Sequence, residues 1–62
     1  MDKGFVFKMT EEVFDVAVAN RNWDLADRCI DEMSALSVQK ERLGKIFYDY
    51  LQFRNTVTRN PN

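Results

Sequence analysis

The fold is decided between residues 36 and 57, where the chain reads LSVQKERLGKIFYDYLQFRNTV. At about 100° per residue, one face of a helix here would carry a stripe of seven side chains: Leu36, Leu43, Ile46, Phe47, Tyr50, Arg54 and Val57. Leu51 and Phe53 widen this stripe on either side. So much apolar surface must pack on the first half of the chain, on a second copy, or on a partner protein.

The chain has 62 residues, which is enough for one domain. A domain of this size buries only about 60% of the surface that its unfolded chain exposes. Small domains therefore often depend on disulfides, metals or oligomerisation. Cys29 is the only cysteine and there is no histidine, so neither an internal disulfide nor a zinc site can form. We expect no metal and no cofactor, so oligomerisation remains as the additional source of stability.

The expected location is the cytoplasm. A lone cysteine and the lack of a secretory signal both favour a reducing compartment. No apolar run approaches the roughly 20 residues that span a bilayer, so we expect no membrane contact.

The net charge of −1 hides an asymmetry between the two halves of the chain. Residues 1–32 hold eight acidic and four basic side chains, a net charge of −4, whereas residues 33–62 hold five basic and two acidic ones, a net charge of +3. Halves of opposite sign attract when the chain folds back on itself or when two chains pair antiparallel. A helix pair whose solvated faces merely differ in charge is the simpler interpretation, because exposed ion pairs are weak.

Residues 1–9 predict a short extended N-terminal arm. Phe5, Phe7 and Met9 alternate with Val6 and Lys8, a period of two that is typical of half-buried strands. Such a strand would pair with its symmetry mate, or the segment would be an arm whose aromatic residues plug a helix pair. We favour the arm.

A helical domain is predicted over residues 10–57. Thr10 is a suitable N-cap, with Met9 and Phe14 at the spacing of a hydrophobic staple, and the first helix should run to about Asn20. Asn22 can cap a second helix, whose apolar positions have the clearest helical period in the chain. Trp23 either covers the end of this hairpin or anchors a partner protein.

The connection to the last helix has two interpretations. We predict a bend or short break near residues 34–38, where Ser34 and Ser37 can each cap a new helix. The alternative is one continuous helix from Trp23 to about Val57, roughly 52 Å long at 1.5 Å per residue, which would require a dimer. Residues 58–62 read as a frayed tail.

No catalytic site is predicted. Histidine, the commonest general base, is absent, and no glycine-rich phosphate loop can be built from two glycines. The acidic pairs at residues 11–12 and 31–32 lie on predicted helix surfaces rather than in a cleft. Cys29 falls on the apolar face of the second helix, where it is expected to be a packing residue. The sequence therefore predicts a protein that is not an enzyme.

Phe5 to Met33 resembles the ribbon-helix-helix repressors in its order of a short strand and two helices. The resemblance implies a DNA-binding regulator whose outward strand residues read the major groove. Here those residues would be Gly4, Val6 and Lys8, with one polar side chain among them. The region is also acidic, which disfavours contacts with phosphates. Nucleic acid is therefore the second choice of partner.

The sequence thus predicts an all-α protein: an antiparallel hairpin or small bundle of two or three helices with the N-terminal arm, completed by homodimerisation through the last helices. Gly44 would allow their close approach, or would be an exposed position without a role. The expected function is a small regulator or adaptor that binds another protein, of a size typical of phage, prophage or plasmid accessory genes. The predicted partner-binding residues are Trp23, Tyr48, Leu51 and Phe53. The predicted core comprises Leu25, Ile30, Met33, Leu43, Ile46, Phe47 and Tyr50.

Overall fold

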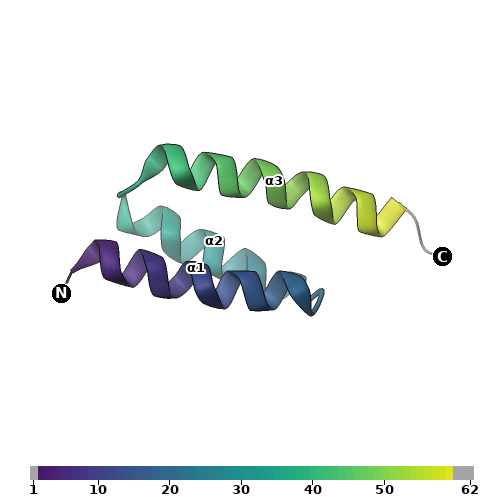
Figure 1. The fold of residues 1–62 in the computed structure, drawn as a ribbon, viewed down its shortest axis with the longest axis horizontal. Helices are drawn as coiled ribbons and strands as arrows, with labels where there is room; N and C mark the ends of the chain where they lie inside the picture. The colour runs from purple at the N-terminus through teal and green to yellow at the C-terminus, as the bar shows by residue number, and fades with distance from the viewer. Residues whose placement is uncertain (1, 60–62) are drawn as a thin grey trace.

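The computed structural model describes residues 2–59, which form three α-helices. Helix α1 spans Lys3–Ala19, α2 spans Trp23–Leu36 and α3 spans Lys40–Arg59. α1 and α2 form an antiparallel hairpin, and α3 turns back along it (Figure 1). The predicted all-α class is confirmed for residues 2–59, which hold three helices rather than two.

The predicted extended arm is wrong, because residues 3–9 form the first turns of α1. The cap is Asp2, whose Oδ1 accepts a hydrogen bond of 2.9 Å from the amide of Gly4. Thr10, the expected cap, lies inside the helix, where its hydroxyl donates to the carbonyl of Val6 at 2.8 Å. In the helix these alternating residues separate: Phe7 extends the spacing of the buried residues Thr10, Phe14 and Ala17, whereas Phe5 and Met9 project to the exposed side.

This helix also removes the basis of the ribbon-helix-helix resemblance. That resemblance required a strand over residues 5–9, and those residues are helical. The expected staple is absent for the same reason, since Met9 is an exposed residue within α1.

The turn between α1 and α2 is the one predicted. Asn22 caps α2, because its side-chain oxygen accepts a hydrogen bond of 3.3 Å from the amide of Leu25. The amide of Asn22 donates to the carbonyl of Ala17 at 2.8 Å, which closes the end of α1. Arg21 turns the chain with a φ of 58°. Local capping chemistry thus explains the hairpin.

The predicted break before the last helix is confirmed, and the single continuous helix is wrong. α2 ends at Leu36, and Ser37 caps it in the left-handed conformation with a φ of 56°. Gln39 also has a positive φ, of 49°, and α3 begins at the next residue. Two left-handed residues within three positions cannot continue a right-handed helix. α3 runs on through Arg59, and the rest of the expected tail lies outside the described residues.

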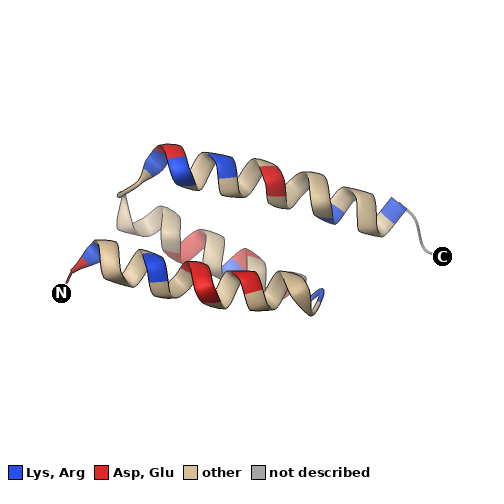
Figure 2. Ribbon diagram, viewed as in Figure 1, with Lys and Arg blue, Asp and Glu red and all other residues tan. Residues whose placement is uncertain are grey.

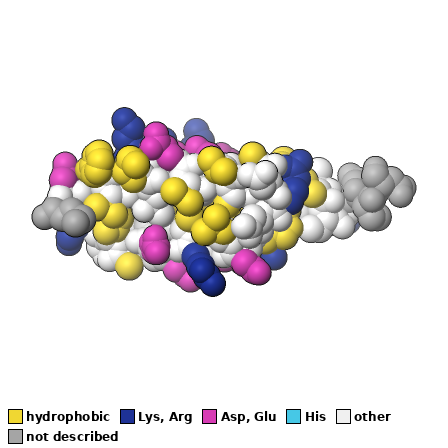
Figure 3. Space-filling model, turned by 90° about the horizontal axis from the view of Figure 1, so that it is seen from below, with side chains coloured by type: hydrophobic (Ala, Val, Ile, Leu, Met, Phe, Trp, Pro, Cys, Tyr) yellow, Lys and Arg dark blue, Asp and Glu magenta, His cyan; other side chains and the backbone are white. Residues whose placement is uncertain are grey.

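The core lies mainly between α1 and α2, which pack on each other more extensively than α2 and α3 do. Of the predicted core residues, Ile30, Met33 and Tyr50 are buried. Leu25, Leu43 and Ile46 are only partly buried, and Phe47 is exposed. The sequence-based prediction assigned too many core residues to α3. α1 is longer than expected, and its side chains fill much of the core instead. Its buried apolar residues are Phe7, Phe14 and Ala17, and α2 adds Ala26 and Cys29. Hydrophobic side chains also remain on the surface, including the side seen in Figure 3.

Two ion pairs attach α3 to the other helices and join the acidic half of the chain to the basic half. Nε and Nη2 of Arg42 donate to the two carboxylate oxygens of Glu11 on α1 at 2.9 and 2.7 Å. Arg54 lies 3.4 Å from the carboxylate of Asp27 on α2. Figure 2 shows that blue positions outnumber red ones on α3, while red positions gather in the middle of the hairpin. The opposite net charges of the two halves are thus partly paired within one chain.

None of the described helices has the length and apolar character that crossing a membrane would require.

Candidate protein-binding surfaces

The cysteine and the acidic side chains of the described residues do not gather into a metal site. Among residues 2–59, no three cysteine, aspartate or glutamate side chains are grouped so as to hold a metal ion. Cys29 is buried against the core, and burial, followed by the charge of Glu32, raises the pKa of its thiol. A protonated, enclosed thiol is a poor nucleophile. The prediction that Cys29 is a packing residue is confirmed.

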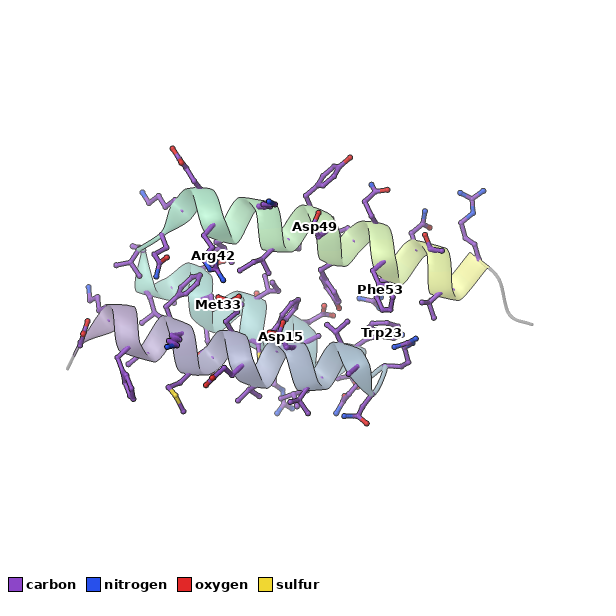
Figure 4. The ribbon with its side chains drawn as sticks, in the orientation of Figure 1. Asp15, Trp23, Met33, Arg42, Asp49 and Phe53 are labelled. Atoms are coloured by element: carbon purple, nitrogen blue, oxygen red, sulfur yellow. The ribbon has the colours of Figure 1, made fainter. Side chains whose placement is uncertain are left out.

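Two of the four predicted binding residues, Trp23 and Phe53, lie together where α2 begins and α3 passes it (Figure 4). Their ring centroids are 6.5 Å apart, and the Trp23 ring lies 6.1 Å from that of Tyr50. The guanidinium of Arg54 lies 5.5 Å from the centroid of the Trp23 ring, and that of Arg21 lies 4.8 Å from the Phe53 centroid. Trp23 is partly buried and closes the end of the hairpin, which is the structural role of the two considered for it.

The other two, Tyr48 and Leu51, lie on a different side of α3. Both are exposed, with 64% of Tyr48 and 44% of Leu51 accessible. At 100° per residue they project roughly 60° apart, whereas Phe53 projects roughly 140° from Tyr48. The four residues therefore do not form one site.

Tyr48 and Leu51 belong to a surface that the sequence only partly revealed. Phe47, expected in the core, is 43% exposed and projects roughly 40° from Leu51 on the wheel. We call Phe47, Tyr48 and Leu51 the α3 surface. The signal for it was present in the sequence, because Phe47 stands at the edge of the stripe, on the side of Leu51.

A groove of about 450 Å³ runs between α2 and α3 beside Phe47. Its apolar walls come from Ile30 and Leu43, and Gly44 leaves it open, since a Cβ there would meet no atom within 4 Å. The polar residues that line it are Asp31, Ser34 and Lys40. We call it the α2–α3 groove.

A second exposed apolar surface lies on α1 and was missed by the sequence analysis. Phe5 and Val16 are each 59% accessible, and Met9 and Val13 are each 46% accessible. These four residues fall within roughly 80° on the helical wheel, so they line one side of the helix. We call them the α1 stripe. Their spacing of four, four and three residues was visible in the sequence, but the assignment of residues 1–9 to an extended arm hid it.

A groove of about 290 Å³ between α1 and α2 continues the α1 stripe sideways. Met9 and Val13 form its α1 wall, and Leu25 and Arg28 lie on the α2 wall. The apolar surface on this side of the molecule is therefore wider than α1 alone.

A third hollow, of about 270 Å³, lies between α1 and α3 and has acidic residues in its lining. Asp15 and Asp49, labelled in Figure 4, lie there with the core residues Phe14 and Tyr50. Partial burial and then the nearby Glu11 raise the pKa of Asp15, while Arg42 opposes the shift. Carboxylates at this position repel phosphate groups.

The α1 stripe and the α3 surface can bury apolar area against another molecule, and neither surrounds a reactive group. Exposed apolar patches bordered by polar residues are typical of protein–protein contacts. In comparisons with known proteins, the chain matches no protein-family model, no curated protein and no solved structure.

Proposed function

We propose that this protein is a non-enzymatic regulator or adaptor, and that the α3 surface and the α2–α3 groove bind an amphipathic helix of another protein. The observation that carries the proposal is an open apolar groove lined by the exposed Phe47, with Tyr48 and Leu51 exposed nearby on the same helix. A helix laid in such a groove buries its apolar side chains at positions i, i+3 or i+4 and i+7.

The polar lining of the groove indicates the chemistry of that partner. Lys40 stands on the α3 wall and Asp31 on the α2 wall, so the two walls carry opposite charges. A partner helix fits best with an acidic residue toward Lys40 and a basic residue toward Asp31, an arrangement that also fixes its orientation. The site thus favours a helix with one apolar face and charges of both signs along its edges.

The open position at Gly44 supports close approach of the partner backbone. Nothing lies within 4 Å of the place that a Cβ would take, so the glycine leaves room that a larger residue would occupy. As part of the proposal, the protein acts in the cytoplasm, which its single cysteine favours.

The experiment is affinity capture from a lysate of the source cells, with four baits in parallel: wild type, Leu51→Glu, Gly44→Leu and, as a matched control, Met9→Glu. Met9 and Leu51 are almost equally exposed, so both glutamates are accommodated at similar cost to the fold. We expect a protein retained by wild type and by Met9→Glu and lost from the other two baits. If nothing is retained, or if all four baits retain the same protein, the proposal is wrong.

A further inference from the structure

We propose that the α1 stripe is a homodimer interface, in which the α1 helices of two copies pack antiparallel across a two-fold axis. This goes beyond the proposed function, because it assigns a second surface and names its occupant as a second copy of this chain. The four residues of the stripe are all about half exposed or more, over nearly the full length of α1.

The stripe exists because α1 has more apolar surface than its neighbours cover. The side that carries Phe7 and Phe14 is buried against the rest of the fold. Met9 and Val13 lie next to that buried side, where they line the groove between α1 and α2, yet each remains 46% accessible. α3 does not reach the stripe, since Glu11, which binds Arg42 of α3, projects roughly 120–160° away from each of its residues. Figure 3 looks from below Figure 1, where α1 is the lowest helix, and shows hydrophobic side chains along that side between charged ones.

Antiparallel pairing covers the whole stripe. When two α1 helices are aligned about the midpoint of the stripe, Phe5 of each chain lies opposite Val16 of the other. Met9 then lies near the axis and contacts Met9 and Val13 of the second copy. A large residue at one end of the stripe thus meets a smaller one from the partner, which favours close packing.

Charges beside the stripe are self-complementary in this arrangement. Lys8 and Glu12 lie on the same flank of α1, roughly 40° apart on the wheel. A two-fold axis between antiparallel helices brings identical flanks together. Lys8 of each chain then lies about one residue rise, roughly 1.5 Å along the axis, from Glu12 of the other chain. The pairing therefore forms two equivalent attractions, and it is this complementarity that selects a second copy as the occupant.

The sequence favoured a dimer through the last helices, and the structure gives a reason to place it on α1 instead. That expectation rested on a first helix of about eleven residues, too short to cover the stripe of α3. α1 has 17 residues, and Tyr50 of α3 is buried within the monomer. The α3 residues that stay exposed cover a shorter length than the α1 stripe does.

The experiment measures molar mass by light scattering and sedimentation equilibrium between about 10 and 500 µM. We expect a concentration-dependent monomer–dimer equilibrium, because one helix pair buries less area than the roughly 1,600 Å² of a standard stable interface. Met9→Glu should be monomeric throughout this range, whereas Leu51→Glu, equally exposed but on α3, should dimerise like wild type. Circular dichroism verifies that both variants remain helical.

A charge exchange tests the geometry without touching the apolar residues. Lys8→Glu and Glu12→Lys should each raise the dimer dissociation constant about three- to tenfold, because each turns two attractions into repulsions. The double variant Lys8→Glu, Glu12→Lys should return to the wild-type value. A wild-type monomer at 500 µM would overturn the proposal. A dimer that Leu51→Glu abolishes and Met9→Glu leaves intact would overturn it in favour of α3, and a double variant that fails to recover would overturn the antiparallel arrangement.

Discussion

The hydroxyl of Tyr50 donates a hydrogen bond of 2.6 Å to Oδ1 of Asp27, which joins the middle of α3 to α2. Nη1 of Arg54 donates to the same hydroxyl oxygen at 3.2 Å. The ring of Tyr50 meets that of Phe14 edge-on, with centroids 5.3 Å apart. One side chain therefore contacts both other helices, and it is the only buried residue that α3 contributes among those described.

Tyr50→Phe tests the hydrogen bond while keeping the ring. We expect the free energy of unfolding to fall by about 1.5 kcal/mol, the low end for a hydrogen bond to a charged group, because the Asp27 side chain is half exposed. Urea unfolding followed by circular dichroism measures the difference. Asp27→Asn, which keeps an acceptor oxygen, should cost less, and a Tyr50→Phe variant as stable as wild type would show that the bond contributes nothing.

Alkaline pH should destabilise the fold through the same residue. Burial raises the pKa of Tyr50 above its usual value, and the hydrogen bond and charge of Asp27 add to the shift, while Arg54 opposes it. The folded state therefore holds the phenol proton more tightly than the unfolded chain does. The resulting stability is fully present below the unfolded pKa of about 10 and is lost as the pH rises through the higher folded pKa. Urea midpoints at pH 8, 10 and 11 should fall more steeply for wild type than for Tyr50→Phe.

Truncation of Met33 should cost much more stability than truncation of Phe47. Met33 is completely buried, so Met33→Ala should cost about 2–5 kcal/mol, which is most of what so small a core supplies. Phe47→Ala should cost less than about 1 kcal/mol, because the ring is 43% exposed. Thermal unfolding of the two variants decides between the core in the structure and the one that the sequence predicted, in which both residues were buried.

Ser37→Gly should stabilise the protein. Ser37 has a φ of 56° and a ψ of 35°, a left-handed conformation that costs a residue with a Cβ about 1–2 kcal/mol. Glycine removes that cost, but it also makes the unfolded chain more flexible, which offsets part of the benefit. The expected net gain in stability is about 0.5–1 kcal/mol. Ser37→Ala is the control, since alanine keeps the Cβ and should bring no gain in melting temperature.

Duplex DNA should not bind at physiological salt. The segment that would have read the major groove is helical, and the hollow between α1 and α3 has acidic side chains in its lining. Gel shifts with random duplex at low and moderate salt give the measurement. Binding that weakens steeply with salt and disappears in Lys8→Ala would contradict this expectation.

Local signals explain which parts of the fold were predictable. The turn at Asn22 and the break near Ser37 depend on helix capping, and the residue types that cap helices can be recognised in the sequence. The N-terminal segment depended on whether Phe7 continues the period of Phe14, and five residues cannot distinguish a period of two from one of 3.6 when their neighbours are also apolar.

The candidate surfaces were harder to predict, because exposure depends on which helix covers which. Tyr48 and Leu51 were correctly expected at the surface, since Tyr48 lies off the apolar stripe of α3 and Leu51 lies at its edge. Phe47 lies on that stripe, and only the packing of three helices shows that it stays partly in solvent. The α1 stripe needed the correct helix boundary before its spacing had meaning.

The position of the α1 stripe, away from the side of α1 that meets α3, has a consequence for how the protein would work. A dimer closed through α1 keeps both α3 surfaces outside, so the assembly is bivalent. A target that carries two recognition helices, or that is itself symmetric, would engage both sites at once, and the second contact would form at the high local concentration set by the first. For such a target, avidity of this kind lets two modest contacts act as one strong one.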